Sequence, residues 1–265
     1  MLSFSNYISL TIIGLHQSWQ EKALISLQLI TYAVLILIFS SIFLVTPFEE
    51  LPASFAINAT VMIWYIIMTE LVTLSGGSHN FHDMREDIKA GNFSSGLQRP
   101  KSYLFIKILN ITGANIVRVA IFFLFGIAMG VYFTKSFPYD WVQIPFLFTS
   151  LYLAAMIYST MFCVLGLVEV WGPYSKPVMW IFQKFTFLFG GLILPLKLYP
   201  EWLQKLVWFT PFPSVFNIPG KIIFKPSVNE MLLGLITQCF WLGSMLFLCF
   251  FVQKIAYEKL LGTGE

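Results

Sequence analysis

Charged side chains are scarce in this sequence. Asp, Glu, Lys and Arg make up 11% of its 265 residues, against about 25% in an ordinary soluble protein. Apolar residues make up 57%, and the mean hydropathy is +0.77. This composition excludes a soluble globular domain and indicates a polytopic membrane protein. The net charge of +3 is too small to indicate binding to nucleic acid.

Several chemical motifs are also missing. The chain has three cysteines, all inside apolar runs, so no disulfide framework is predicted. No G-x-x-x-x-G-K-S/T sequence occurs, so the chain lacks the loop that holds ATP phosphates. His79, His82 and Asp83 have the spacing of metal ligands but do not complete a ligand shell. We therefore expect no metal, no cofactor and no catalytic residue in this chain.

Six apolar stretches have about 20 residues or more, the length that a helix needs to cross about 30 Å of hydrocarbon. They cover residues 23–45, 53–74, 103–133, 144–168, 178–196 and 230–252. Ahead of them, residues 1–22 have apolar side chains at helical spacing opposite polar ones, which predicts a helix lying in the membrane interface. We predict one all-α transmembrane domain over residues 1–265, with six spans and a close helix contact at Gly126-x-x-x-Gly130.

The basic residues predict how the chain is oriented. The loop 75–102 carries four of them, whereas the loops 46–52 and 134–141 together carry one, Lys135. By the positive-inside rule, the loop 75–102 and both termini are expected in the cytoplasm. The segment 196–229 counts against this assignment, because it places four lysines on the opposite side.

The segment LILPLKLYPEWLQKLVWFTPFP, residues 192–213, is too apolar for an ordinary loop and too rich in proline for a plain span. It predicts a short amphipathic helix of about three turns after Pro200, with Trp202, Leu206 and Phe209 turned toward the membrane-embedded body. Residues 196–229 would then form a re-entrant or surface-lying hairpin at the outer edge of the bilayer. The alternative is an interfacial loop with an aromatic belt.

A second informative stretch is MREDIKAGNFSSGLQRPKSY, residues 84–103. It contains the pattern Asp87-Ile88-Lys89-x-Gly91, followed by Leu97-x-Arg99-Pro100. Four elements follow later in the chain: Gly190-Gly191, Pro195-Leu196, Pro200-x-Trp202-Leu203 and Pro211-Phe212. With these two groups of motifs, the sequence resembles the permease subunits of bacterial type 2 ABC exporters over nearly its whole length.

The resemblance implies a permease in a bacterial inner membrane that forms the substrate path with a second permease, identical or homologous. Two cytoplasmic ATPase subunits that bind ATP and Mg would drive it. The loop 75–102 would carry the coupling helix that docks on an ATPase, and paired hairpins would form an outer gate. The candidate coupling residues are Arg85, Glu86, Asp87, Ile88, Lys89, Gly91, Arg99 and Pro100. The candidate gate residues are Pro195, Pro200, Trp202, Leu206, Phe209, Pro211 and Phe212. Without the resemblance, the loop is better interpreted as a solvated cytoplasmic loop.

The candidate intramembrane polar residues in the predicted spans are Asn58, Glu70 and Arg118. A carboxylate at membrane depth is costly, so Glu70 is expected to pair with Arg118 or Lys107 rather than to contact a substrate. Two alternatives to an exporter stay open. One is a non-transporting membrane scaffold or assembly subunit, and the other is a membrane-embedded enzyme, which would need clustered carboxylates or histidines at a membrane surface.

Overall fold

The computed structural model describes residues 4–48, 57–77, 79–96 and 102–263. Every regular element in these ranges is a helix, which confirms the all-α prediction. The α-helices are α1 (Phe4–Gln20), α2 (Lys22–Val45), α3 (Ala59–Ser75), α4 (His79–Lys89), α5 (Asn92–Ser95), α6 (Tyr103–Thr134), α7 (Gln143–Leu167), α8 (Ser175–Gly190), α9 (Glu201–Val207), α10 (Phe212–Val215), α11 (Asn217–Gly220) and α12 (Val228–Thr263). The 3-10 helices are η4 (Val168–Trp171), η5 (Leu196–Leu198) and η6 (Lys221–Phe224).

In the part of the chain that the structure describes, five helical segments are long and apolar enough to cross a membrane. They are Lys22–Val45, Ala59–Lys89, Tyr103–Thr134, Gln143–Trp171 and Val228–Gly262. They coincide with five of the six predicted spans. The predicted span at 178–196 is not one continuous helix, because α8 has 16 residues and ends at Gly190. At 1.5 Å per residue it reaches about 24 Å, short of the roughly 30 Å of a hydrocarbon core.

Gly191 ends α8. Its φ of +73° lies in the left-handed region, which glycine adopts without strain. The N–H groups of Gly191 and Leu192 donate back to carbonyls in the last turn of α8, at 3.4 and 3.0 Å. The carbonyls of the same two residues accept from α3: Tyr65 donates to Gly191, and Thr69 donates to Leu192 at 2.8 Å. The helix therefore breaks here without leaving these backbone groups unpaired.

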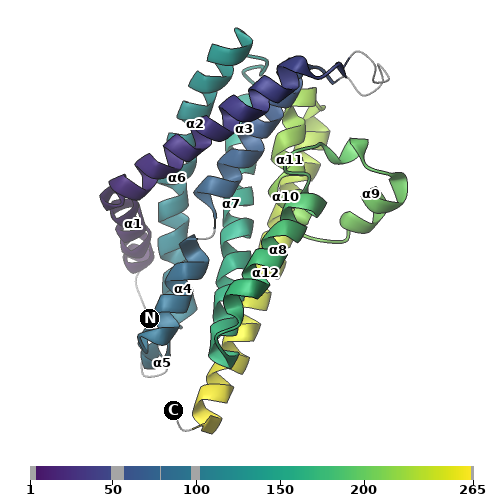
Figure 1. Ribbon diagram of the computed structural model, residues 1–265. Coiled ribbons are helices and arrows are strands. Elements are labelled where there is room, and N and C mark those ends of the chain that lie inside the picture. The colour runs from purple at the N-terminus through teal and green to yellow at the C-terminus, as the bar shows by residue number, and fades with distance from the viewer. Residues whose placement is uncertain (1–3, 49–56, 78, 97–101, 264–265) are drawn as a thin grey trace.

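The helices α3 and α7 form the centre of the bundle (Figure 1). Residues 62–72 of α3 are all buried. Close approach to α7 needs a glycine, since a Cβ on Gly76 would lie 2.6 Å from the carbonyl oxygen of Ala155. Ser159 of α7 donates to the Gly76 carbonyl at 3.1 Å and accepts from Asn115 of α6 at 2.9 Å. These two bonds join α3, α6 and α7 at one point.

Glycines also bring aromatic rings and α1 close to α6. A Cβ on Gly130 would lie 2.6 Å from the Trp64 ring, and one on Gly126 would lie 2.6 Å from the Tyr32 hydroxyl. This confirms the predicted close helix contact. On the other side of α6, Gly113 packs against the backbone of α1. The helix predicted ahead of the first span is thus present, and its position in the membrane interface stays a prediction.

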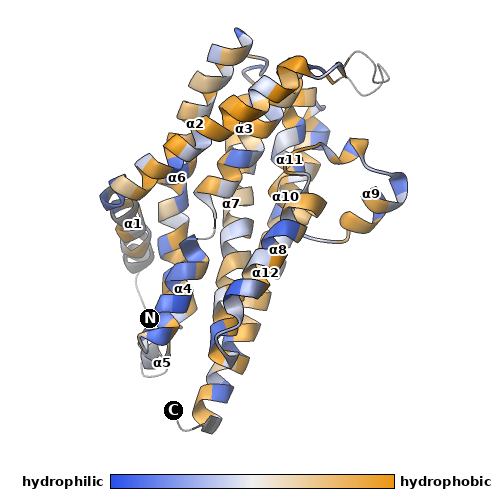
Figure 2. Cartoon of the chain, in the orientation of Figure 1, coloured by the Kyte–Doolittle hydropathy of each residue, from blue (hydrophilic) through white to orange (hydrophobic). Residues whose placement is uncertain are grey.

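The outer helices expose apolar side chains. Those of α2 and α12 include Leu27, Ile30, Leu37, Ile236, Phe240 and Phe247. Figure 2 shows both helices mainly in the hydrophobic colour, whereas α4 is mainly hydrophilic. Such surfaces suit lipid or a second membrane protein. Figure 1 marks both chain termini at the end of the bundle where α4 and α5 lie.

Candidate functional site

Two cations of α4 converge on one carboxylate at the end of α7. Arg85 Nε lies 2.9 Å from Glu169 Oε2, and Lys89 Nζ lies 3.4 Å from Glu169 Oε1. Glu169 belongs to η4, and its side chain is only 5% exposed. Ser175, the first residue of α8, also donates to this carboxylate. Glu169 therefore links α4 to the junction between α7 and α8.

A carboxylate of α4 contacts the first turns of α6. Asp87 accepts a hydrogen bond from the Tyr103 hydroxyl, and its Oδ2 lies 3.0 Å from Lys107 Nζ. The same ammonium group lies 3.8 Å from Asp83, one helical turn earlier. Asp83 and Asp87, one helical turn apart, thus both interact with the Lys107 ammonium group. The sequence did not predict this arrangement. The pair joins α4 to α6.

The short helix α5 contacts the last turns of α12. Gly91 separates it from α4 with a φ of +74°, and no atom lies near its missing Cβ, so the backbone conformation alone requires glycine. Phe93 is then fully buried, stacked on Tyr257 of α12 with ring centroids 4.6 Å apart and edge-on to Tyr103 at 5.5 Å. The α4–α5 unit therefore touches α6, α7 and α12.

The structure divides the candidate coupling residues into two sets. Arg85 and Asp87 face the bundle, where the contacts above occupy them, and Ile88 packs half-buried beside them. Glu86, Lys89 and Gly91 are exposed. Arg85 and Asp87 therefore make contacts within this chain, and the polar rim that the charged run would offer an ATPase stays a prediction. Arg99 and Pro100 lie outside the described residues.

Arg118 sits in a buried polar cluster between α1, α4 and α6. Its guanidinium pairs with Glu21 and lies 3.2 Å from His79 Nδ1. Lys107, as described, pairs with α4. The predicted pairing of Glu70 with either cation is therefore wrong: Glu70 is buried in α3, and both cations have nearer carboxylates on α4 and ahead of α2.

Asn58 does not lie within a span. It is the N-cap of α3, and its side chain accepts from the N–H of Val61 at 2.9 Å. The predicted span began at residue 53, so Asn58 fell inside it. In the structure its short amide satisfies one of the free N–H groups at the helix start.

The backbone that follows α8 turns back into the bundle. Residues 213–220, which include all of α11 and all of α10 except Phe212, are buried. Gln238 of α12 donates to the carbonyl of Ser214 at 2.9 Å and to that of Ser150 in α7 at 3.0 Å. A Cβ on Gly220 would lie 2.5 Å from the Tyr65 ring. Protein side chains therefore enclose this short-helix segment and satisfy part of its backbone.

The helix α9 has the opposite orientation to the predicted one. It covers seven residues, about two turns, and stands out from the bundle (Figure 1). Val207 is its buried residue, whereas Trp202, Leu206 and Phe209 are 67%, 56% and 84% exposed. The prediction that these three pack into the body of the same chain is wrong. Val207 faces inward instead, and the apolar face lies on the surface of this chain.

The prolines of the candidate gate mark the starts of short helices. Pro195 precedes η5, Pro200 precedes α9, and Pro211 precedes α10. Each position suits a residue with no N–H to donate and a fixed φ. Phe212, the first residue of α10, packs half-buried with its ring 5.6 Å from that of Phe182 in α8.

Comparison with known proteins agrees with this architecture. The family model described as ABC-2 family transporter protein matches residues 25–263. A search of curated protein sequences returned no match. The family match covers nearly the whole chain and all five candidate spans except the first three residues of α2. The chain is therefore a multi-pass membrane protein and belongs to the ABC-2 transporter family as a permease subunit.

Proposed function

We propose that this chain is the transmembrane subunit of an ATP-driven ABC exporter. It forms the substrate path with a second permease, identical or homologous, and two separate ATPase subunits bind ATP and Mg. The family match supports the permease role, and the missing P-loop sequence means that ATP must be bound by a partner. The distribution of basic residues supports an orientation with both termini in the cytoplasm, and the resemblance to bacterial exporters supports a bacterial inner membrane location.

The contacts of α4 carry the proposal. The exposed residues Glu86, Lys89 and Gly91 offer a polar surface for an ATPase. Behind that surface, Arg85 and Asp87 connect α4 to α7 and α6. A displacement of α4 by a closing ATPase pair would therefore reach two spans through ion pairs instead of being lost in a flexible loop. The α4–α5 unit acts as the coupling element.

The sixth crossing is made by α8 together with the non-helical residues 191–195 that follow it. The helix alone is too short, but the bonds from Tyr65 and Thr69 hold the next two carbonyls against α3. Residues 196–227 then form the outer, re-entrant part that precedes α12. Its buried segment 213–220 and its exposed helix α9 support this reading.

The exposed face of α9 is the contact surface of an outer gate. Trp202, Leu206 and Phe209 present apolar side chains that this chain leaves uncovered. The same helix of a second permease is their partner in the closed gate. Packing between two such faces would be lost on opening, so it controls release more than folding.

Purification of the tagged chain from native membranes tests the function. We expect a P-loop ATPase to co-purify in stoichiometric amount, the detergent-solubilised complex to hydrolyse ATP, and proteoliposomes of the complex to move solute only with ATP. A chain that purifies without any nucleotide-binding subunit would overturn the proposal. An ATPase complex that hydrolyses ATP but moves no solute would favour the scaffold alternative.

A further inference from the structure

The predicted spans contain three basic residues, Lys107, Arg118 and Lys184. Lys107 and Arg118 both pair with carboxylates of this chain. For Lys184, no acidic side chain in the part of the chain that the structure describes lies within ion-pair distance. Its Nζ instead lies 5.4 Å from the centroid of the Phe187 ring. The described residues therefore give the Lys184 ammonium group no counter-charge.

Lys184 lies well inside the depth of the bundle. It follows Ser175, the first residue of α8, by nine positions, which is about 14 Å of helix. The nearby Phe187 packs on the Phe216 ring at 5.9 Å, and Tyr158, nine residues before the end of α7, packs on the same ring at 5.6 Å. Figure 2 shows a hydrophilic band at this level of α8. A lysine side chain is too short to bring its ammonium group from here to the level of Ser175.

The side of α8 that carries Lys184 is exposed in this chain. The helix packs on α7 and α10, and Met179 and Thr186 belong to its buried side. Trp180, Lys184 and Leu188 follow one another at intervals of four residues and are exposed, so they share one face, which we call the α8 stripe. Ionisable side chains in membrane spans almost always face other protein or a water-filled cavity. The α8 stripe is therefore not expected to face lipid.

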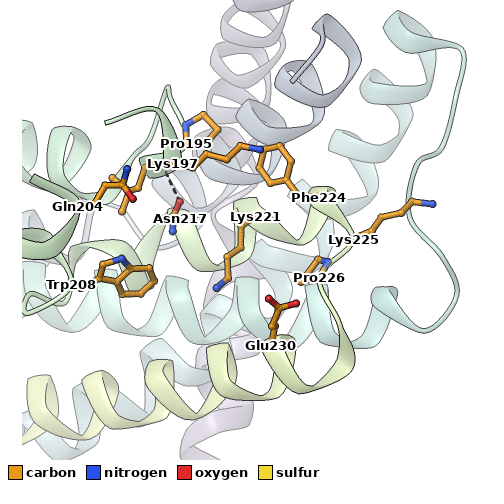
Figure 3. Close-up of a pocket in the computed structure, with 11 residues that line it drawn as sticks. Pro195, Lys197, Gln204, Trp208, Asn217, Lys221, Phe224, Lys225, Pro226 and Glu230 are labelled. Atoms are coloured by element: carbon orange, nitrogen blue, oxygen red, sulfur yellow. Dashed lines mark hydrogen bonds between the residues drawn. The ribbon is translucent and has the colours of Figure 1, made fainter. Parts of the chain in front are cut away.

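Lysines at the outer end of the bundle lie beside carboxylates. Lys225 Nζ is 3.4 Å from Asp140. Lys221 lines a cavity of about 410 Å³ together with Glu230 (Figure 3). These charges are balanced, in whole or in part, within this chain. The charge of Lys184 is not, so its counter-charge must come from another molecule.

A second copy of this chain offers no suitable carboxylate. The predicted spans contain two acidic residues, Glu70 and Glu230. Glu70 is buried in α3 and 5% exposed. Glu230 lies in the first turn of α12, where it accepts from the N–H and hydroxyl of Ser227 at 2.7 and 2.9 Å. Two facing copies of the α8 stripe would thus bring two ammonium groups together, and an anion between them would balance both.

We propose that the α8 stripe lines the substrate path and that the transported molecule is an anionic amphiphile. Lys184 contacts its phosphate, sulfate or carboxylate group, and Trp180 and Leu188 contact the apolar part beside that group. Because the proposed function places the path between two permeases, this assignment rests on it. The charge of Lys184 adds the class of substrate.

Thiol labelling tests whether water reaches the α8 stripe. The full chain is purified with the subunits that accompany it, its native cysteines replaced, and reconstituted in phosphatidylcholine vesicles. The Leu188→Cys variant is then treated with charged methanethiosulfonates, which react with the thiolate, a species that forms in water and not in hydrocarbon. We expect Leu188→Cys to react, whereas Phe240→Cys, exposed on α12, should not. Equal rates at the two positions, or no reaction at Leu188→Cys, would overturn the path assignment.

Two reagents of opposite charge test the role of Lys184. Residues four apart on a helix have Cβ atoms about 5–6 Å apart, and at that distance in water one charge changes the rate of a charged reagent about threefold. Lys184→Gln should therefore lower the ratio of the sulfonatoethyl to the trimethylammonioethyl rate at Leu188→Cys about tenfold. Lys176→Gln is the matched control, because Lys176 is exposed on α8 about 18 Å from Leu188. Its ratio should stay within about twofold, and an unchanged ratio in Lys184→Gln would overturn the site.

Protection against labelling tests the class of ligand. Decyl phosphate should slow the reaction of Leu188→Cys, and Lys184→Gln should abolish this protection. Equal protection by decyltrimethylammonium would overturn the anionic assignment, and equal protection by inorganic phosphate would overturn the amphiphile. Phosphatidylglycerol that protects when added to the vesicles would identify a membrane phospholipid as the anionic amphiphile, and its failure to protect would identify a molecule from solution.

These measurements do not require ATP, so they separate this proposal from the exporter function. Protection that depends on Lys184 in a chain without an ATPase partner would refute the exporter and retain the anion site. An ATP-driven exporter without such protection would refute the anion site alone.

Discussion

Replacing Glu169 with glutamine tests how α4 is attached to α7. The glutamine keeps the shape of the side chain but removes the charge that Arg85 and Lys89 share. Arg85, whose side chain is 16% exposed, then lacks a counter-charge. Breaking a fully buried pair costs about 3 to 5 kcal/mol, and a hydrogen bond to a charged group is worth about 1.5 to 3. Because Arg85 keeps some contact with water, we expect a loss of about 2 kcal/mol. Lys89 is 52% exposed and adds less than about 1.

Hydrogen exchange measures this loss locally. A fall of about 2 kcal/mol in the free energy of opening α4 raises the exchange rate of its amides about thirtyfold. Glu86→Gln is the matched control, because Glu86 lies on the exposed face of the same helix and is expected to change exchange little. The double variant Arg85→Gln/Glu169→Gln should recover part of the loss, since two neutral amides leave no charge without a partner.

The loss of the contact between α4 and α7 should also impair transport. In proteoliposomes of the complex, Glu169→Gln should retain ATP hydrolysis and lose most transport, because an ATPase still docks on the exposed face while α7 no longer follows α4. Unchanged exchange in α4 would refute the role given to Glu169. A rise in exchange spread evenly over all helices would refute it too, since it would mean general destabilisation.

Three further predictions concern orientation, the break after α8, and the gate. With the native cysteines replaced, a cysteine at Ser94 should be shielded from an impermeant thiol reagent in intact cells and one at Lys197 should react; the reverse would overturn the orientation. Gly191→Ala should lower stability by about 1 to 2 kcal/mol, because its φ is left-handed. Gly243→Ala, which places its new Cβ in open space, should leave stability unchanged. Equal melting temperatures of the two variants would contradict the role given to Gly191. Trp202→Ala should leave folding and ATP hydrolysis normal, because the ring is 67% exposed, but should impair export; normal export would exclude the gate.

The spans were predictable because their signal is local and long. A run of about 20 apolar residues can satisfy its backbone in a membrane only as a helix, whatever its neighbours are. Gly91 was also recognisable, since its left-handed φ is a local backbone conformation that requires glycine. The five long spans depend on one segment each and were therefore predicted correctly from the sequence.

Features that depend on partners far away in the sequence were not predicted correctly. The break after α8 was missed because its carbonyls are satisfied from α3, more than 120 residues earlier. The partner of Arg118 is Glu21, 97 residues away, and membrane depth alone favoured Glu70 instead. Periodicity likewise defined the apolar face of α9 but not the side to which it turns, which depends on where Val207 packs. Glu169 could have been found, because it is the acidic residue in a short loop predicted on the same side as the basic loop 75–102.

The helix α3 connects the two regions that the motifs single out. At one end its Gly76 is held against Ser159 and leads directly into α4. In its middle, Tyr65 and Thr69 hold the carbonyls where α8 breaks. Residues 62–72 are buried on every side, so α3 has no free face toward which it can bend. We expect a displacement of α4 to move Tyr65 and Thr69 with it. The backbone after α8 would then either follow α3 or lose two hydrogen bonds, which surrounding lipid would not replace.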